Sequence, residues 1–90
     1  MSVTIDAHYF IPVLTDDKDI IKVNGNTVGE AFQQLIAMYP KTRDWLIGKD
    51  GKISNTIEVY VNQESAQPEG LAKPVKDGDI IHIVMMISGG

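Results

Sequence analysis

The chain has 90 residues, of which 43% are hydrophobic, with no cysteine and a formal net charge of −4 at pH 7. This length accommodates one small domain, and the longest apolar runs are too short to span a membrane. The lack of cysteine excludes a disulfide framework, a thiolate nucleophile and a cysteine-ligated metal. Because an acidic chain is unsuited to neutralising phosphates, nucleic acid is not an expected partner. Residues 1–6 lack the basic and apolar segments of a secretory signal, so we expect a cytoplasmic protein.

The first quarter of the chain predicts a pair of antiparallel strands. An alternating pattern over residues 3–11 predicts one strand with a single face on the core, and Pro12 ends it or places it at an edge. The residues expected on the core face are Val3, Ile5, Ala7, Tyr9 and Ile11. After a polar bend, the run at 20–23 predicts the second strand, closed by the turn at 24–26.

A helix is predicted to begin at Thr27. Thr27 and Glu30 have the spacing of a capping box, in which the threonine hydroxyl satisfies a free backbone N–H and the glutamate three residues on reaches back. The apolar stripe expected to face the core consists of Val28, Ala31, Phe32, Leu35, Met38 and Tyr39. Pro40 cannot continue the helix.

The second half of the chain predicts strands around irregular segments. Residues 41–47 predict one short helical turn in which Trp45 and Leu46 pack, and residues 57–61 predict a strand by alternation. A turn at 62–64, a loop at 65–70 and an extended piece at 71–75 follow. The last strand, 80–87, is apolar except at His82, which predicts a central strand covered on both faces. We therefore expect an α+β fold in which one main helix packs across a mixed sheet.

Catalytic and metal-binding patterns are weak in this sequence. His8 and His82 have no metal-ligand spacing and are expected to be solvated or hydrogen-bonded surface residues. The aspartates at 16–19 and 77–79 fit turns better than a calcium loop, and the glycines do not form a phosphate-binding motif. We expect neither an enzyme nor a chain that binds a cofactor or metal of its own.

The strongest functional signal is the pair Gly89 and Gly90 at the end of the final strand. Glycine lacks a Cβ, so these residues can enter a channel too narrow for a side chain. Fully extended, residues 87–90 would carry the terminal carboxylate on the order of 13 Å beyond the folded body. A frayed terminus that happens to end in glycine is the alternative. We predict one domain over 1–90, with a flexible tail at 88–90 whose carboxylate is the working group.

Three segments of the chain form a familiar combination: Val59-Tyr60-Val61-Asn62, the stretch from Gly70 to Asp79 that ends in Lys76-Asp77-Gly78-Asp79, and Ser88-Gly89-Gly90. Together they resemble the ubiquitin-like sulfur carriers of the MoaD/ThiS family, and most of all its CysO-like branch. The order of the opening strand and the capped helix extends the resemblance over nearly the whole chain. It implies a β-grasp, ubiquitin-like fold.

The resemblance also implies a chemistry for the tail. A MoeB/ThiF-like adenylyltransferase would use ATP and magnesium to make an acyl-adenylate on Gly90, and sulfide or a persulfide would convert it to a thiocarboxylate. A synthase would then accept the sulfur for cysteine or homocysteine, molybdopterin or thiazole synthesis. Gly89 would give access, and Met85, Met86, Ile87 and Ser88 would contact the partner. This chain has Met85-Met86 where many members of the family have prolines. We expect it to be a monomer when no partner is bound.

Two other functions fit the same tail. Gly90 could be joined to lysines of target proteins, which would make the chain a protein modifier, or the chain could be an interaction module with an inert tail. The sequence leaves open the pathway that receives the sulfur, the identity of the activating enzyme and the choice between carrier and modifier.

Overall fold

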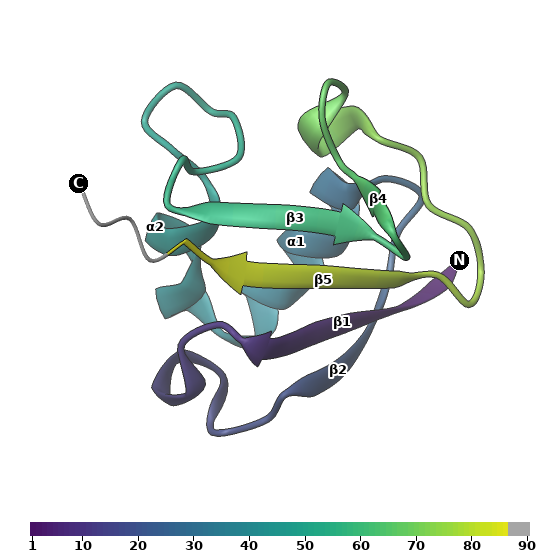
Figure 1. The fold of residues 1–90 in the computed structure, drawn as a ribbon. Coiled ribbons are helices and arrows are strands. Elements are labelled where there is room, and N and C mark those ends of the chain that lie inside the picture. The colour runs from purple at the N-terminus through teal and green to yellow at the C-terminus, as the bar shows by residue number, and fades with distance from the viewer. Residues whose placement is uncertain (87–90) are drawn as a thin grey trace.

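A five-stranded mixed sheet organises the computed structural model, which describes residues 1–86 (Figure 1). Its strands are β1 (Ser2–Tyr9), β2 (Ile20–Asn24), β3 (Ile57–Val61), β4 (Glu64–Ser65) and β5 (Ile80–Met85). They lie in the order β2-β1-β5-β3-β4. The pair β1 and β5 is parallel, whereas the other neighbours are antiparallel. The predicted strands, the antiparallel β1–β2 pair and the central place of the last strand are thereby confirmed.

The main helix, α1 (Val28–Met38), packs across one face of the sheet and lies behind it in Figure 1. Its predicted capping box is confirmed, because the Thr27 hydroxyl accepts a hydrogen bond from the Glu30 N–H at 3.1 Å. The Glu30 carboxylate reaches back to the N–H of Asn26 at 2.8 Å. After Pro40 a 3₁₀ turn (Pro40–Thr42) leads into the single turn of α2 (Arg43–Leu46), and two further 3₁₀ helices span Pro12–Thr15 and Gly70–Ala72.

The hydrophobic core lies between α1 and the face of the sheet that α1 covers. Its largest fully buried side chains are Ile5, Phe32, Leu35, Leu46, Ile81 and Ile83. This arrangement is the β-grasp fold expected from the sequence. Among residues 1–86, no helix is long and apolar enough to cross a membrane.

Two apolar side chains predicted to pack are instead exposed. Met38 is 51% exposed because it lies at the margin of the helical stripe, at the last residue of α1. Trp45 is 39% exposed, next to the fully buried Leu46. Successive residues of a helical turn point about 100° apart, so the turn that buries Leu46 directs Trp45 outward.

The predicted core face of the first strand is wrong at Tyr9, whereas Ile11, beyond the strand, is partly buried against the core. The β1–β5 register shifts between Asp6 and Tyr9, which places one extra residue in β1. A bulge of this kind reverses the alternation of side chains. Tyr9 is therefore 67% exposed, Phe10 is buried in its place, and the strand ends at Tyr9 rather than at Ile11.

The last strand is central, but the prediction that both its faces are covered is wrong. Ile81 and Ile83 are buried under α1, whereas Ile80 is exposed and His82 and Val84 are half-buried. The uncovered side of the sheet, here called the open face, is turned toward the viewer in Figure 1. Apolar residues of β5 therefore lie on both faces of the sheet, and only one of these faces packs against the core.

Candidate functional site

The end of β5 is the part of the predicted site that the structure describes. Met85 is partly buried against the core, whereas Met86 is 40% exposed and donates its N–H to the Thr56 carbonyl at 2.9 Å. Of the two methionines predicted to contact the partner, Met85 thus packs against the core and Met86 is the exposed one. The predicted site residues Ile87, Ser88, Gly89 and Gly90 lie outside the described residues.

The turn before β5 ties the start of this strand to the start of β1. The Ser2 N–H donates to the Asp77 carboxylate at 2.9 Å, and the Gly78 N–H donates to the Ser2 carbonyl at 2.8 Å. Gly78 has φ of +87°, a conformation that favours glycine. The turn predicted from the Asp77-Gly78 pair is thereby confirmed, and it fixes where β5 begins.

Asn62 and Asp79 hold the start of β5 a second time. Asn62 donates its side-chain N–H to the Asp79 carboxylate at 3.1 Å and accepts from the Ile80 N–H at 3.0 Å. The hydrogen bond from Asn62, a backbone hydrogen bond from Lys76 and the Lys76 charge hold the pKa of Asp79 below its ordinary value. These contacts explain the structural role of two residues in the segments that carry the family resemblance.

The open face is crossed by a row of five paired residues, one from each strand. The strand registers place them in the order Ile20, Asp6, His82, Tyr60 and Ser65. On one side of this row lies Lys22-Thr4-Ile80, and on the other Tyr9-Val84-Glu58. Around the polar centre of this row, the exposed apolar or aromatic residues are Tyr9, Ile20, Tyr60 and Ile80, and the polar residues are Lys22, Thr4, Glu58 and Ser65.

The polar centre is an Asp6–His82 pair. The His82 Nδ1 lies 2.8 Å from one carboxylate oxygen of Asp6, and the other oxygen accepts from the His8 N–H at 3.0 Å. His8 makes a second pair at the edge of the sheet, where its Nδ1 lies 3.1 Å from the Asp19 carboxylate. Both histidines are hydrogen-bonded surface residues, as predicted.

The open face is not apparent from local sequence patterns. The only signal for it was the single polar residue, His82, in an otherwise apolar strand. Its partner Asp6 lies 76 residues away, and only the β1–β5 register brings the two together.

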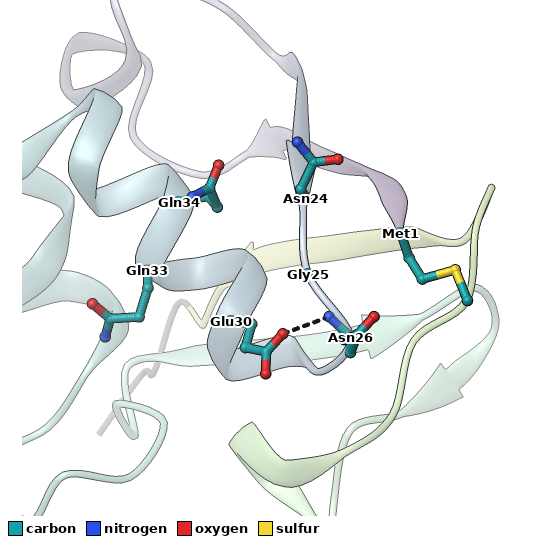
Figure 2. Close-up of a pocket in the computed structure, with 7 residues that line it drawn as sticks. All are labelled: Met1, Asn24, Gly25, Asn26, Glu30, Gln33 and Gln34. Carbon is teal, nitrogen blue, oxygen red and sulfur yellow. Dashed lines mark hydrogen bonds between the residues drawn. The ribbon is translucent and has the colours of Figure 1, made fainter.

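No group of three or more histidine, cysteine, aspartate or glutamate side chains in residues 1–86 could hold a metal ion. A shallow hollow lies where the N-terminus, the end of β2 and the first turn of α1 meet (Figure 2). Its Glu30 carboxylate is engaged with Asn26, as the dashed line shows. Because β1 and β5 are parallel, this hollow at the start of β1 lies at the opposite end of the sheet from the end of β5. It is not part of the candidate site.

Comparisons with known proteins agree with the β-grasp topology described above. The sulfur carrier protein CysO of Mycobacterium tuberculosis is 28% identical over the full length of both chains. Its crystal structure has a TM-score of 0.86 at 26% identity, covering 94% of this chain and 99% of that one. CysO in the BexX/CysO complex of Amycolatopsis orientalis has a TM-score of 0.83 at 30% identity, with coverage of 98% and 99%.

The model of the ThiS family matches residues 12–90, which include every strand after β1 and the predicted tail. The match extends through Gly90, beyond the residues that the structure describes. The resemblance seen in the sequence is thereby confirmed, and the chain belongs to the ThiS family.

Proposed function

We propose that this chain is a sulfur carrier protein whose working group is the carboxylate of Gly90. The observation that carries the proposal is the ThiS family match through Gly90. The full-length similarity to CysO, which is named a sulfur carrier protein, supports it. In this role the chain is a co-substrate of enzymes rather than a catalyst.

The proposed cycle begins with activation, because a carboxylate is a poor electrophile. A MoeB/ThiF-like adenylyltransferase with ATP and magnesium joins a Gly90 carboxylate oxygen to the α-phosphorus of ATP, and pyrophosphate leaves. Hydrosulfide, or the terminal sulfur of a persulfide, then attacks the carbonyl carbon. The bond from that carbon to the AMP oxygen breaks; with hydrosulfide, Gly90 is left as a thiocarboxylate. A persulfide donor gives an acyl disulfide; a thiol then attacks the donor-side sulfur, forms a disulfide with the donor and releases the thiocarboxylate.

Delivery to a sulfur-accepting synthase completes the cycle. The acceptor belongs to the synthesis of cysteine or homocysteine, of molybdopterin or of thiazole. The complex between CysO and BexX in Amycolatopsis orientalis supports a protein partner for a carrier of this type. Gly89 gives Gly90 access to each active site, since a glycine backbone fits a narrow channel.

The open face is the surface on which we place the activating enzyme. Along β5, Ile80, His82 and Val84 point to this face, and Met86 is the next exposed residue before the tail. One partner can therefore cover this row and also hold the tail, which follows Met86 in the chain. Met85 supports the row from the core side, and we assign Ile87 and Ser88 to contacts with the same partner.

The test is ATP–pyrophosphate exchange with the MoeB/ThiF-like enzyme of the same organism. The intact carrier should support exchange, and a variant that ends at Ser88 should not. Adding sulfide should then replace one oxygen of Gly90 by sulfur in the intact mass. Exchange without sulfur incorporation, together with Gly90 linked to lysines in the cell, would instead favour the protein modifier. If the intact carrier supports no exchange, the interaction module with an inert tail becomes the better account.

A further inference from the structure

Strand β2 forms the longer of the two edges of the sheet. It is the last strand on its side, as Figure 1 shows, and the opposite edge is formed by β4, which has only two residues. An edge strand presents backbone N–H and C=O groups to which another extended chain can bind. The edge of β2 therefore offers more of these groups than the edge of β4.

The register between β1 and β2 determines which backbone groups of β2 point away from the sheet. The Ala7 N–H donates to the Asp19 carbonyl at 2.7 Å, and the Gly25 N–H donates to the Met1 carbonyl at 3.0 Å. Because hydrogen-bonded and non-hydrogen-bonded pairs alternate along antiparallel strands, the odd-numbered residues of β2 bond to β1 in this register. The residues that direct their N–H and C=O groups outward are Ile20, Lys22 and Asn24.

These three residues are exposed, and their outward backbone groups are available for pairing. Apart from the pairing with β1, no backbone hydrogen bond within residues 1–86 involves Ile20, Lys22 or Asn24. A strand placed beside β2 can bond to all three residues through its own backbone, as in β-strand addition. The edge is therefore suited to an extended peptide segment.

Lys22 lies at the centre of this edge and gives it a charge preference. None of the ion pairs within residues 1–86 involves Lys22, and its neighbour on β1 is the uncharged Thr4. Opposite charges on directly opposed residues of neighbouring strands are favourable, and like charges are unfavourable. A second copy in full antiparallel overlap would place one Lys22 against the other. An aspartate or glutamate in a different protein would instead pair with Lys22.

The hollow of Figure 2 adjoins the end of the same edge. It is lined by Asn24 of β2 and by Gln33 and Gln34 of α1, among others. Alternate side chains of an added strand point to the α1 side of the sheet, and those beside Asn24 reach this hollow. Because a side-chain amide both donates and accepts hydrogen bonds, small polar side chains fit there.

We propose that the edge of β2 binds an extended acidic segment of a partner protein as an additional strand of the sheet, with a carboxylate opposite Lys22. Strand β1 separates β2 from β5, so the added strand does not pair with β5 or displace its neighbours. The partner can therefore stay attached while another protein contacts β5. The edge binds in this way whether or not Gly90 carries sulfur.

The test uses a backbone-cyclised hairpin peptide whose outer strand alternates valine and threonine around one glutamate. A preformed strand loses less conformational entropy on binding than a linear peptide. Amide hydrogen exchange of the full chain, followed by NMR, is the measurement. Without peptide, the amides of Ile21 and Val23 should exchange slowly and those of Ile20, Lys22 and Asn24 rapidly, because only the first two are bonded to β1. The glutamate peptide should protect the other three.

A second peptide, with lysine in place of glutamate, and three substitutions at Lys22 separate the charge from the backbone. At low salt the wild type should bind the glutamate peptide at least about threefold more tightly than the lysine peptide. Lys22→Glu should reverse this order, and Lys22→Ala should bind both peptides equally. Lys22→Pro removes an outward N–H without breaking a bond to β1, and it should bind neither peptide.

The proposal is overturned if the peptides bind without protecting the amides of Ile20, Lys22 and Asn24, if the wild type binds both peptides equally, or if it binds neither. Protection of these amides without peptide, increasing with protein concentration, would also overturn it, because a second copy would then occupy the edge. Should Lys22→Pro fail to fold, Lys22→Glu and the wild-type amides still decide the outcome. Failure of the proposed function is a separate result, since ATP–pyrophosphate exchange measures activation of Gly90 and not peptide binding.

Discussion

Asn62 holds Asp79 and Ile80 at once: its amide donates to the Asp79 carboxylate at 3.1 Å and accepts from the Ile80 N–H at 3.0 Å. Asn62 has φ of +57°, so Asn62→Gly removes both contacts and keeps the backbone conformation accessible. We expect a loss of about 1–2 kcal/mol in the free energy of unfolding, from two hydrogen bonds of typical strength. Urea unfolding at pH 7 measures it.

The neighbouring Gln63→Ala is the control, because the Gln63 side chain is exposed. It should change the free energy of unfolding by less than about 0.5 kcal/mol. Equal losses in the two variants would show that the Asn62 contacts contribute nothing specific to the start of β5.

Asp79 should make the stability of the protein depend on acidity. Its pKa in the folded state is lowered, chiefly by the hydrogen bond from Asn62. A carboxylate whose pKa falls on folding stabilises the protein at pH values above its unfolded pKa and loses this contribution as pH falls through the folded pKa. Asp79→Asn should therefore be less stable than the wild type at pH 7, by less than about 1 kcal/mol because the group is exposed.

The measurement is urea unfolding of both proteins between neutral pH and pH values below the unfolded pKa. The difference between them should shrink as the pH falls past that value. A difference that stays constant over this range would contradict the assignment to Asp79 ionisation.

The fold was largely predictable because its local signals agree with one another. The Thr27 and Glu30 cap, the apolar stripe of α1 and the Asp77-Gly78 turn each depend on residues close in sequence. The error in β1 arose where long-range pairing decides, whereas Met38 and Trp45 were misplaced because of the direction of their side chains on a helical turn. The extra residue in β1 exchanges Tyr9 and Phe10 between faces, and no local pattern reveals it.

Dependence on long-range strand pairing also limited the prediction of the site. Gly89 and Gly90 are recognisable by composition and position, whereas the open face exists only once β1, β3 and β5 are aligned. The apolar run of β5 was interpreted as two covered faces, because burial in a core and exposure for a partner both require apolar residues. The polarity of His82 is the one feature of this strand that indicates an exposed face rather than a buried one.

The cap of α1 should contribute measurably to stability. Thr27→Ala removes the acceptor for the Glu30 N–H and should lower the free energy of unfolding by about 1 kcal/mol. Thr27→Ser keeps a hydroxyl and should recover most of it. Thermal unfolding of the three proteins makes the comparison, and a serine variant as unstable as the alanine variant would assign the loss to the threonine methyl group instead.

Met85 and Met86 should have separable roles. Met85 is partly buried against the core, so Met85→Ala should cost about 1–2 kcal/mol, below the range for fully buried methionines. Met86→Ala should alter stability by less than about 0.5 kcal/mol because the side chain is exposed. In ATP–pyrophosphate exchange, however, Met86→Ala should raise the KM for the carrier. If Met86→Ala left the KM unchanged, Met86 would not contact the activating enzyme.

The central claim is that Gly90 carries sulfur, and the most direct measurement is the intact mass of the protein recovered from its native cell under sulfur demand. The terminus is sequenced by fragmentation, and a variant that lacks Gly89 and Gly90 serves as the control. We predict a population in which one oxygen of Gly90 is replaced by sulfur, absent from the control. If Gly90 is found only as a carboxylate or only linked to lysines of other proteins, the carrier account is contradicted.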